Sequence, residues 1–172
     1  WPDNRAMEDE GDRQTLDLVT RYDGPWDERE AARFLLRTKT PMRLAVNTPS
    51  GFPAIVSLWF LYEGDALHAA VHESAKLVKR LRDDPRCTVE VAPNEPPYHG
   101  VRIRCFAELS RDEGGALLRR LLVRYLGTAE SKLGRWLLSR ADGELHVTLR
   151  PITVSSWDYR ERMKDASAAT SD

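Results

Sequence analysis

Three apolar segments follow one another between residues 42 and 71, and the turns between them are too short to hold a helix. Met42–Thr48 leads through Thr48-Pro49-Ser50-Gly51 into Pro53–Tyr62, and Glu63-Gly64-Asp65 leads into Ala66–Val71. Parallel neighbours in a sheet need a crossover of a dozen or more residues, whereas antiparallel neighbours need only a tight turn. We therefore expect an antiparallel meander here and disfavour a doubly wound parallel sheet.

Helix start signals lie on both sides of this meander. Asp27 and Glu30 form an Asp-x-x-Glu capping box, Ser74 is placed to cap a helix, and Ser110 with Glu113 forms a second box. Apolar residues recur at helical spacing after each signal. The expected helices span residues 28–38, 75–82, a segment containing Leu117–Tyr125, and residues 131–139.

The second half of the chain supplies further strands, expected at Cys87–Val91, Val101–Leu109, Glu144–Arg150 and Thr153–Trp157, the last two separated by Pro151. Pro93–Gly100 is predicted to be a loop because its prolines cannot donate ladder hydrogen bonds, and its role as a lid is left open. Strands joined by hairpins, with helices between some of them, favour an α+β fold: an antiparallel barrel of six to seven strands with peripheral helices.

The two ends of the chain differ from this body. Residues 1–24 are acidic and polar and are expected to form a flexible arm. Residues 164–172 are expected to form a disordered tail, which leaves one folded domain over residues 25–163.

Charge and composition exclude several classes of protein. Lysine and arginine number 26 against 27 acidic residues, so the net charge of -1 gives no electrostatic case for a nucleic-acid or anionic-membrane partner. The sequence lacks an apolar stretch long enough to span a membrane and lacks a secretion-signal layout at its start, so a cytoplasmic location is expected. Two cysteines, Cys87 and Cys105, are too few for a disulfide framework and are interpreted as core residues.

The residues give no support for hydrolytic or metal chemistry. His68 and His72 lie four apart on one strand, about 13 Å from each other and too far to share a metal. His99 and His146 stand alone, and the serines lack a nucleophile-elbow context. We therefore expect no metal site and assign no catalytic residue.

The segment from His72 to Lys76 has the features of an anion seat. A strand ends here, Ser74 precedes a helix, and Lys76 lies in the first helical turn. Free N–H groups and the positive end of the helix dipole attract an anion, and the ammonium group adds a full charge. An ordinary capped helix with a solvated basic face remains the alternative.

The strand Pro53–Phe60 is apolar on both faces. One face is expected to join the core. The other would either contact a planar aromatic ligand, with Ser57 and the backbone reading its polar edge, or lie under a helix or in a dimer interface. Both alternatives stay open.

The order of these features resembles the pyridoxamine 5′-phosphate oxidase-like family of flavin-binding split β-barrels, including its flavin- and deazaflavin-dependent reductases. The resemblance rests on Gly51-Phe52-Pro53 before Ser57-Leu58-Trp59-Phe60, then on Glu73-Ser74-Ala75-Lys76 followed by Leu81-Arg82-Asp83-Asp84-Pro85-Arg86, and on the strands Val101–Leu109 and Val154–Asp158. It covers about residues 27–160.

The resemblance implies a homodimer with cofactor sites at the subunit interface and places the cofactor on particular residues. FMN is the first expectation, with a deazaflavin or haem as alternatives. Trp157 is a candidate for packing on the ring, with core packing an equal alternative, and His72, His99 or His146 is a candidate axial ligand for haem. The isoalloxazine ring would run along Ala54, Ile55, Val56 and Ser57, and His72, Glu73, Ser74 and Lys76 would hold the ribityl phosphate.

The expected function is a flavin- or deazaflavin-dependent oxidoreductase acting on a small organic acceptor. The alternative is a non-catalytic flavin or haem carrier or sensor on the same barrel. Three departures from the family pattern stand out. Cys105 replaces a common glycine, and Arg43 is the candidate for an arginine that often precedes the ring-binding strand but is not a clear match to it. Trp157-Asp158-Tyr159-Arg160 does not match the substrate residues of vitamin B6 oxidases. Pyridoxine phosphate oxidation is therefore disfavoured.

Overall fold

The computed structural model describes residues 20–112 and 115–164. Residues 1–19 of the expected N-terminal arm and residues 165–172 of the expected tail lie outside this part of the chain. Residues 21–23, at the end of the expected arm, form a short strand.

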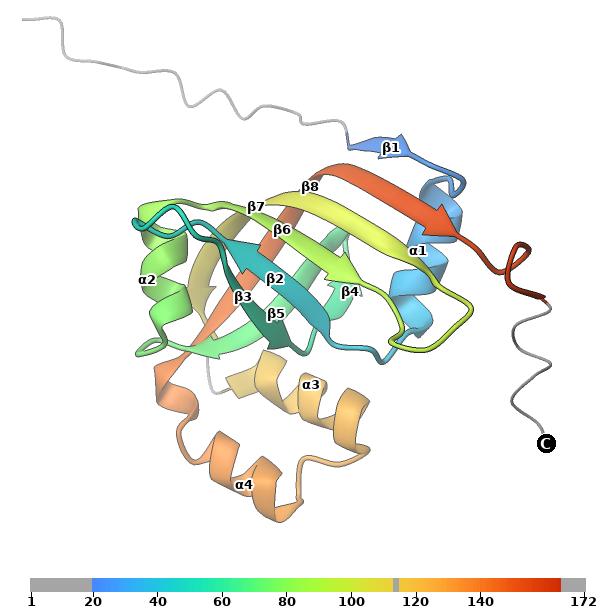
Figure 1. Ribbon diagram of the computed structural model, residues 1–172. Helices are drawn as coiled ribbons and strands as arrows, with labels where there is room; N and C mark the ends of the chain where they lie inside the picture. The colour runs from blue at the N-terminus through green and yellow to red at the C-terminus, as the bar shows by residue number, and fades with distance from the viewer. Residues whose placement is uncertain (1–19, 113–114, 165–172) are drawn as a thin grey trace, which may run out of the picture.

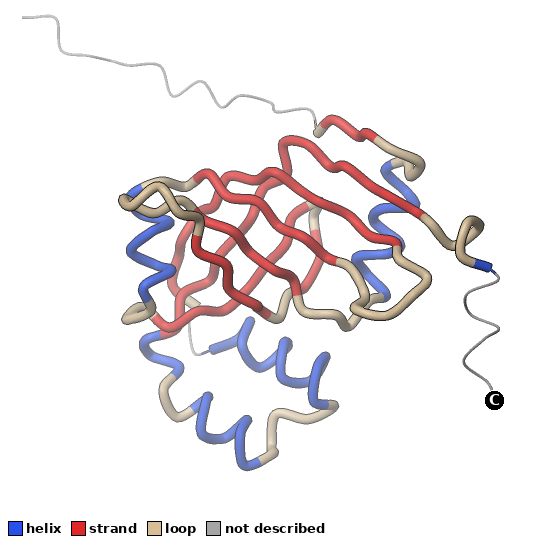
Figure 2. Tube along the Cα trace, in the orientation of Figure 1, coloured by secondary structure: helices blue, strands red, loops and turns tan. Residues whose placement is uncertain are grey.

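Seven antiparallel strands form one strongly curled sheet in the order β3-β2-β6-β7-β8-β5-β4, and the three-residue β1 pairs in parallel with β8 (Figures 1 and 2). The expected α+β fold, an antiparallel split barrel with peripheral helices, is confirmed. The strands are β1 (Arg21–Asp23), β2 (Met42–Val46), β3 (Ala54–Leu58), β4 (Leu61–Glu63), β5 (Ala66–His72), β6 (Arg86–Val91), β7 (His99–Arg111) and β8 (Glu144–Asp158).

Within the described residues, four α-helices lie around the barrel: α1 (Glu28–Arg37), α2 (Lys76–Asp83), α3 (Ala116–Leu126) and α4 (Lys132–Leu138). Figure 1 shows α1 and α2 at opposite ends of the sheet and the α3–α4 pair outside it, near β5. The apolar sides of α1 and α2 join the main core, which the inward side chains of the strands fill; Phe60, Leu67 and Ile103 are fully buried there. The α3 and α4 helices form smaller apolar clusters with Trp59 and Ala70.

Two strand predictions were wrong in detail. The apolar run Pro53–Tyr62 is divided after Leu58, where the backbone of Phe60 pairs with the hydroxyl of Tyr125 instead of with a strand. Its two halves, β3 and β4, lie at opposite edges of the sheet, so the expected meander of three neighbouring strands does not form. Pro151 does not break the last strand: β8 continues through it, with a bulge opposite Arg104 and Cys105. The bulge leaves Ile152, the neighbour of Pro151, out of the ladder. Prolines within sheets are found at bulges because they cannot donate a ladder hydrogen bond.

The capping predictions had mixed outcomes. Asp27 and Glu30 form the expected box, at 2.8 and 3.1 Å. Ser74 does not cap α2: the cap residue is Ala75, and the Ser74 hydroxyl lies 2.8 Å from Nδ1 of His72. Ser110 lies within β7, and Glu113 lies outside the described residues. Asp112, which the sequence analysis did not single out, caps α3 instead: its carboxylate accepts hydrogen bonds from the first N–H groups of this helix.

Within the described residues, no helix is long and apolar enough to cross a membrane. The same part of the chain brings no three metal-binding side chains of His, Cys, Asp or Glu together.

Candidate functional site

A cavity of about 340 Å³ lies where β3 meets β5 beneath α3 and α4. These two strands are not hydrogen-bonded to each other in the sheet, and the curl of the barrel brings them together. We call this cavity the β3–β5 groove; Ser57, Trp59, Ala70, His72, Leu137 and Glu144 are among its lining residues. It therefore joins two side chains that the sequence analysis assigned to different parts of one cofactor site, Ser57 and His72.

The β3 strand presents one face to the core and the other outward. Ala54, Val56 and Leu58 pack against the main core, whereas Ser57 is exposed and Ile55 is 67% exposed. Among the described residues β3 pairs only with β2, so the main-chain groups along its other edge have no strand partner. An open strand edge of this kind can hydrogen-bond the polar rim of a flat ligand.

The segment after β5 holds its side chains in fixed positions. The backbone N–H of Ser74 donates to Nδ1 of His72 at 3.3 Å, which assigns the proton of the neutral ring to Nε2. The His72 ring lies against Gly143, where an added Cβ would come within 2.4 Å of Nε2. Glu73 forms an ion pair with Arg111 at 2.9 Å. These contacts anchor the loop that precedes α2.

Lys76 is the free charge of this segment. Its side chain is exposed at the first residue of α2 and makes no ion pair with any residue that the structure describes. The neighbouring Glu73 is already neutralised by Arg111. The first turn of α2 has no side-chain cap, so an anion would find both an unpaired ammonium group and backbone N–H groups there.

Glu144 is a groove residue that the sequence analysis missed. It begins β8 directly opposite His72 and is only 7% exposed. Burial raises the pKa of its carboxyl group, and nearby Asp112 adds to this, while His72 and Arg140 oppose it. No sequence signal identified it, because a glutamate at the start of a strand is ordinarily solvated.

Trp157 lies apart from this groove within the chain. It sits near the far end of β8, opposite Gly100, and its ring is 5.4 Å from the guanidinium carbon of Arg102. Arg43 is also occupied elsewhere, since it pairs with Glu90 at 3.6 Å and contacts Asn94. Neither side chain lines the β3–β5 groove.

The three histidines considered as axial ligands are in three different places. His72 lines the groove but is engaged by Ser74. His146 lies 2.8 Å from His68. His99 begins β7 and pairs with Asp158, which is at the far end of β8 from Glu144. Its Nδ1 donates to the carbonyl of Pro97 at 2.8 Å. The structure thus brings only His72 to the predicted cofactor segment.

No family model and no curated protein matches this sequence. Solved structures do match the fold. An F420 reductase aligns with a TM-score of 0.62 and 22% identity, over 70% of this chain and 93% of that one. An FAD-binding protein of Mesorhizobium loti aligns with a TM-score of 0.56 and 22% identity, over 76% and 93%. A candidate pyridoxamine 5′-phosphate oxidase of Listeria innocua aligns with a TM-score of 0.52 and 14% identity, over 71% and 91%.

These alignments cover most of the chain at low sequence identity, so they show a shared fold and no more. The chain has the fold of the pyridoxamine 5′-phosphate oxidase-like split β-barrels.

Proposed function

We propose that this protein is a flavin- or deazaflavin-dependent oxidoreductase that acts on a small organic acceptor, with FMN as the first candidate cofactor. One observation carries the proposal: the β3–β5 groove places the open edge of β3 and Ser57 beside His72, next to the uncapped start of α2. Proteins that share the fold include one named as an F420 reductase and one named as FAD-binding, which supports the same class of cofactor.

In this proposal the ring of FMN and its phosphate lie in different places, the ring in the β3–β5 groove and the phosphate at the start of α2. The groove's volume of about 340 Å³ is within the range of small-molecule pockets, and Trp59, Ala70 and Leu137 give it an apolar lining. The ring would lie along β3, where Ser57 and the main-chain groups can bind its polar edge. The phosphate would lie at the start of α2, where Lys76 and the backbone N–H groups favour an anion.

Each part of the groove has a task in this proposal. The α3–α4 pair covers one side of the groove, and the Glu144 side chain closes it where β8 begins. A bound flavin or deazaflavin supplies hydride transfer, and the protein supplies binding and orientation. A haem carrier has less support because, of the three candidate axial ligands His72, His99 and His146, only His72 lines the groove.

We further propose that the protein acts as a homodimer. The outward side chains of β2, β3, β6, β7 and β8 form a face, here called the outer sheet face, that no described helix covers (Figure 1). Ile55 and Phe106 are exposed there at 67% and 37%. A hollow of about 340 Å³ on this face is lined by Ala45, Phe106 and Ile152 as well as by arginines. Exposed apolar groups next to polar ones are typical of an interface between subunits.

The test is a titration of the full chain with FMN, riboflavin and a deazaflavin, followed by calorimetry and by the absorbance of the bound cofactor. We expect FMN to bind more tightly than riboflavin, which lacks the phosphate. Lys76→Gln should weaken FMN about tenfold and leave riboflavin within about twofold, because only FMN uses the ammonium group. Lys79→Gln, one turn further along the exposed side of α2, is the matched control and should change neither affinity.

A second variant tests the ring position. Ala70→Phe would fill the apolar part of the β3–β5 groove and should weaken FMN and riboflavin alike. Failure of FMN, riboflavin and the deazaflavin to bind would contradict the proposal. Equal weakening of FMN and riboflavin by Lys76→Gln would show that the phosphate lies elsewhere.

A further inference from the structure

A second cleft, of about 380 Å³, lies at the end of the barrel where α1 meets the ends of β7 and β8. Trp26, Phe34 and His99 line it together with Arg33, Arg37 and Arg160. None of these residues lines the β3–β5 groove, so nothing in the proposed function accounts for this cleft. We call it the α1 cleft.

Three rings form the apolar wall of the α1 cleft. The centroids of Trp26 and Phe34 are 5.1 Å apart, those of Phe34 and His99 are 5.6 Å apart, and those of Trp26 and His99 are 6.1 Å apart. The planes are tilted by 50° to 73°, as in edge-to-face aromatic packing. A flat ring that enters the cleft would extend this packing.

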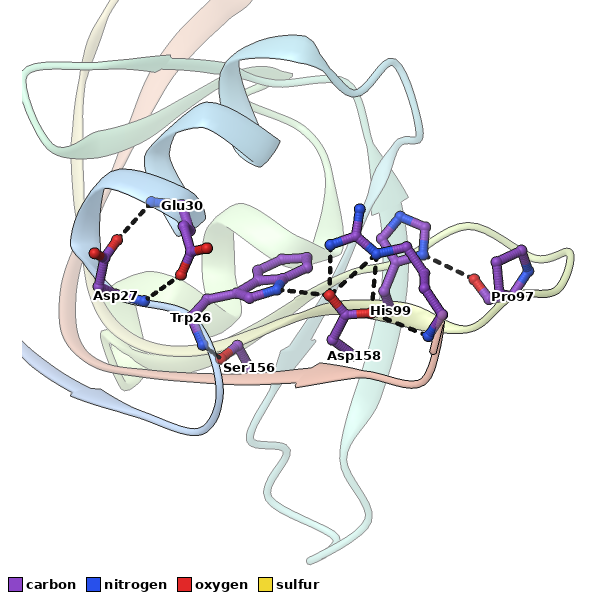
Figure 3. A network of polar contacts seen from close by, with 8 residues as sticks. Trp26, Asp27, Glu30, Pro97, His99, Ser156 and Asp158 are labelled. Atoms are coloured by element: carbon purple, nitrogen blue, oxygen red, sulfur yellow. Dashed lines mark hydrogen bonds and ion pairs between the residues drawn. The ribbon is translucent and has the colours of Figure 1, made fainter. Parts of the chain in front are cut away.

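Hydrogen bonds hold two of these rings, those of Trp26 and His99, in place (Figure 3). The indole Nε1 of Trp26 donates to Asp158 at 3.0 Å, and the Trp26 backbone N–H donates to the Ser156 hydroxyl at 3.0 Å. Asp158 also accepts from Arg160, whose guanidinium carbon lies 5.8 Å from the centre of the Trp26 ring. The His99 ring is fixed by its bond to the Pro97 carbonyl. The wall is thus organised before any ligand arrives.

The rim of the α1 cleft carries unpaired positive charge. Arg33 and Arg37 are one helical turn apart on α1, are both exposed, and form no ion pair with any residue in ranges 20–112 and 115–164. Like charges at this spacing repel each other, which an anion between them would relieve. Arg160 is already compensated by Asp158.

One negative charge also borders the cleft. Glu30 lines it, and its carboxylate accepts the backbone N–H of Asp27 at 3.1 Å. With Arg160 compensated, the two free arginines and Glu30 leave a single net positive charge. This balance favours a ligand with one negative charge over a doubly charged phosphate, and the planar guanidinium groups match a carboxylate.

From these contacts we propose that the α1 cleft binds a small aromatic carboxylate, with its ring against Trp26 and Phe34 and its carboxylate at Arg33 and Arg37. The ring wall selects a flat apolar body, and the arginine pair selects the single charge. This site is independent of the flavin proposal, because its residues and its ligand are different.

The test is calorimetric titration of the full chain, without added flavin, using 2-naphthoate as the probe and its uncharged analogue 2-naphthamide as the comparison. We expect 2-naphthoate to bind and 2-naphthamide to bind at least about tenfold more weakly. Arg33→Gln combined with Arg37→Gln should remove most of this difference. Arg29→Gln, an exposed arginine on the same helix outside the cleft, is the matched control and should change neither affinity.

Two further variants locate the ring. Phe34→Leu keeps an apolar side chain but removes a ring of the wall, and it should weaken both probes. Ala70→Phe in the β3–β5 groove should weaken neither. The proposal is overturned if 2-naphthoate does not bind at millimolar concentration, if the double arginine variant binds it as tightly as the original protein, or if Ala70→Phe abolishes binding. Flavin binding has no bearing on these outcomes, so the two proposals fail separately.

Discussion

Nδ1 of His68 on β5 lies 2.8 Å from Nε2 of His146 on β8, so one imidazole donates a hydrogen bond to the other across two paired strands. The arrangement requires at least one neutral ring, because two imidazolium groups would present two protons and two positive charges to each other. Burial and the neighbouring His68 lower the pKa of His146, with Arg120 acting in the same direction and Asp112 against it.

This pair predicts a loss of stability in mild acid. Below the ordinary histidine value of 6.5, the unfolded chain takes up a proton that folded His146 resists, so the free energy of unfolding should fall as the pH decreases below that value. Urea denaturation between about pH 7.5 and 5 measures the slope, and His146→Gln should make it shallower. An unchanged slope in this variant would show that other groups cause the pH dependence.

A second prediction concerns Asp112, whose carboxylate caps the first turn of α3. Asp112 is 6% exposed, and its two oxygens accept the N–H groups of Leu117 and Leu118 at 2.9 and 3.0 Å. Asp112→Ala should lower the free energy of unfolding by about 1–2 kcal/mol, because two helix N–H groups lose their acceptor. Asp112→Asn keeps one oxygen and should cost less.

Urea denaturation also measures this effect, and Glu108→Ala is a suitable comparison because it removes only an exposed ion pair with Arg150. Equal losses for Asp112→Ala and Glu108→Ala would contradict the capping role. Since α3 covers the β3–β5 groove, the alanine variant should also weaken FMN if the proposed function is correct.

The contact between Gly143 and His72 predicts non-additive substitutions. A Cβ at Gly143 would lie 2.4 Å from Nε2 of His72, and the ring cannot move without breaking its contact with Ser74. Gly143→Ala should therefore cost about 1–3 kcal/mol in the free energy of unfolding. In a His72→Ala background the same change should cost much less, and a double-mutant cycle measures the difference. If the losses in the free energy of unfolding from Gly143→Ala and His72→Ala were additive, the alanine methyl group would be clashing with a group other than His72.

The proposed homodimer predicts that charge on the outer sheet face dissociates the subunits. Ile55→Asp and Phe106→Asp each place a carboxylate on that face and should raise the dimer dissociation constant at least about tenfold, as sedimentation equilibrium would show. Val123→Asp is the control, since Val123 is 51% exposed on α3 and away from that face. A protein that is monomeric at micromolar concentration before any substitution contradicts the proposal.

Local signals predicted most of the secondary structure. The Asp27–Glu30 box fixed the start of α1, and the short turns after Gly51 and around Gly64 correctly indicated antiparallel neighbours. The errors came where another group, two residues away in one case and far along the chain in the other, competes for the same atoms. Ser74 bonds with His72 instead of capping α2, and the Phe60 backbone pairs with Tyr125, 65 residues away.

The candidate site was predictable in its parts but not in its assembly. Ser57 and His72 were identified from the character of their own segments, and the structure places both in the β3–β5 groove. Glu144 was missed because only the cover formed by α3 and α4, together with its pairing to His72, explains its burial. Trp157 was grouped with these residues by resemblance, and within one chain it lies near the other end of β8.

The sequence by itself determined the class of fold, because strand periodicity and turn length act over a few residues and leave few ways to pair neighbouring strands. The tertiary structure alone decided which side chains share a cavity. The curl of the sheet brings β3 to β5, and the path of the last strand brings Asp158 and Arg160 to Trp26 on the way into α1. These contacts depend on packing between segments that are distant in the sequence, and no local pattern encodes them.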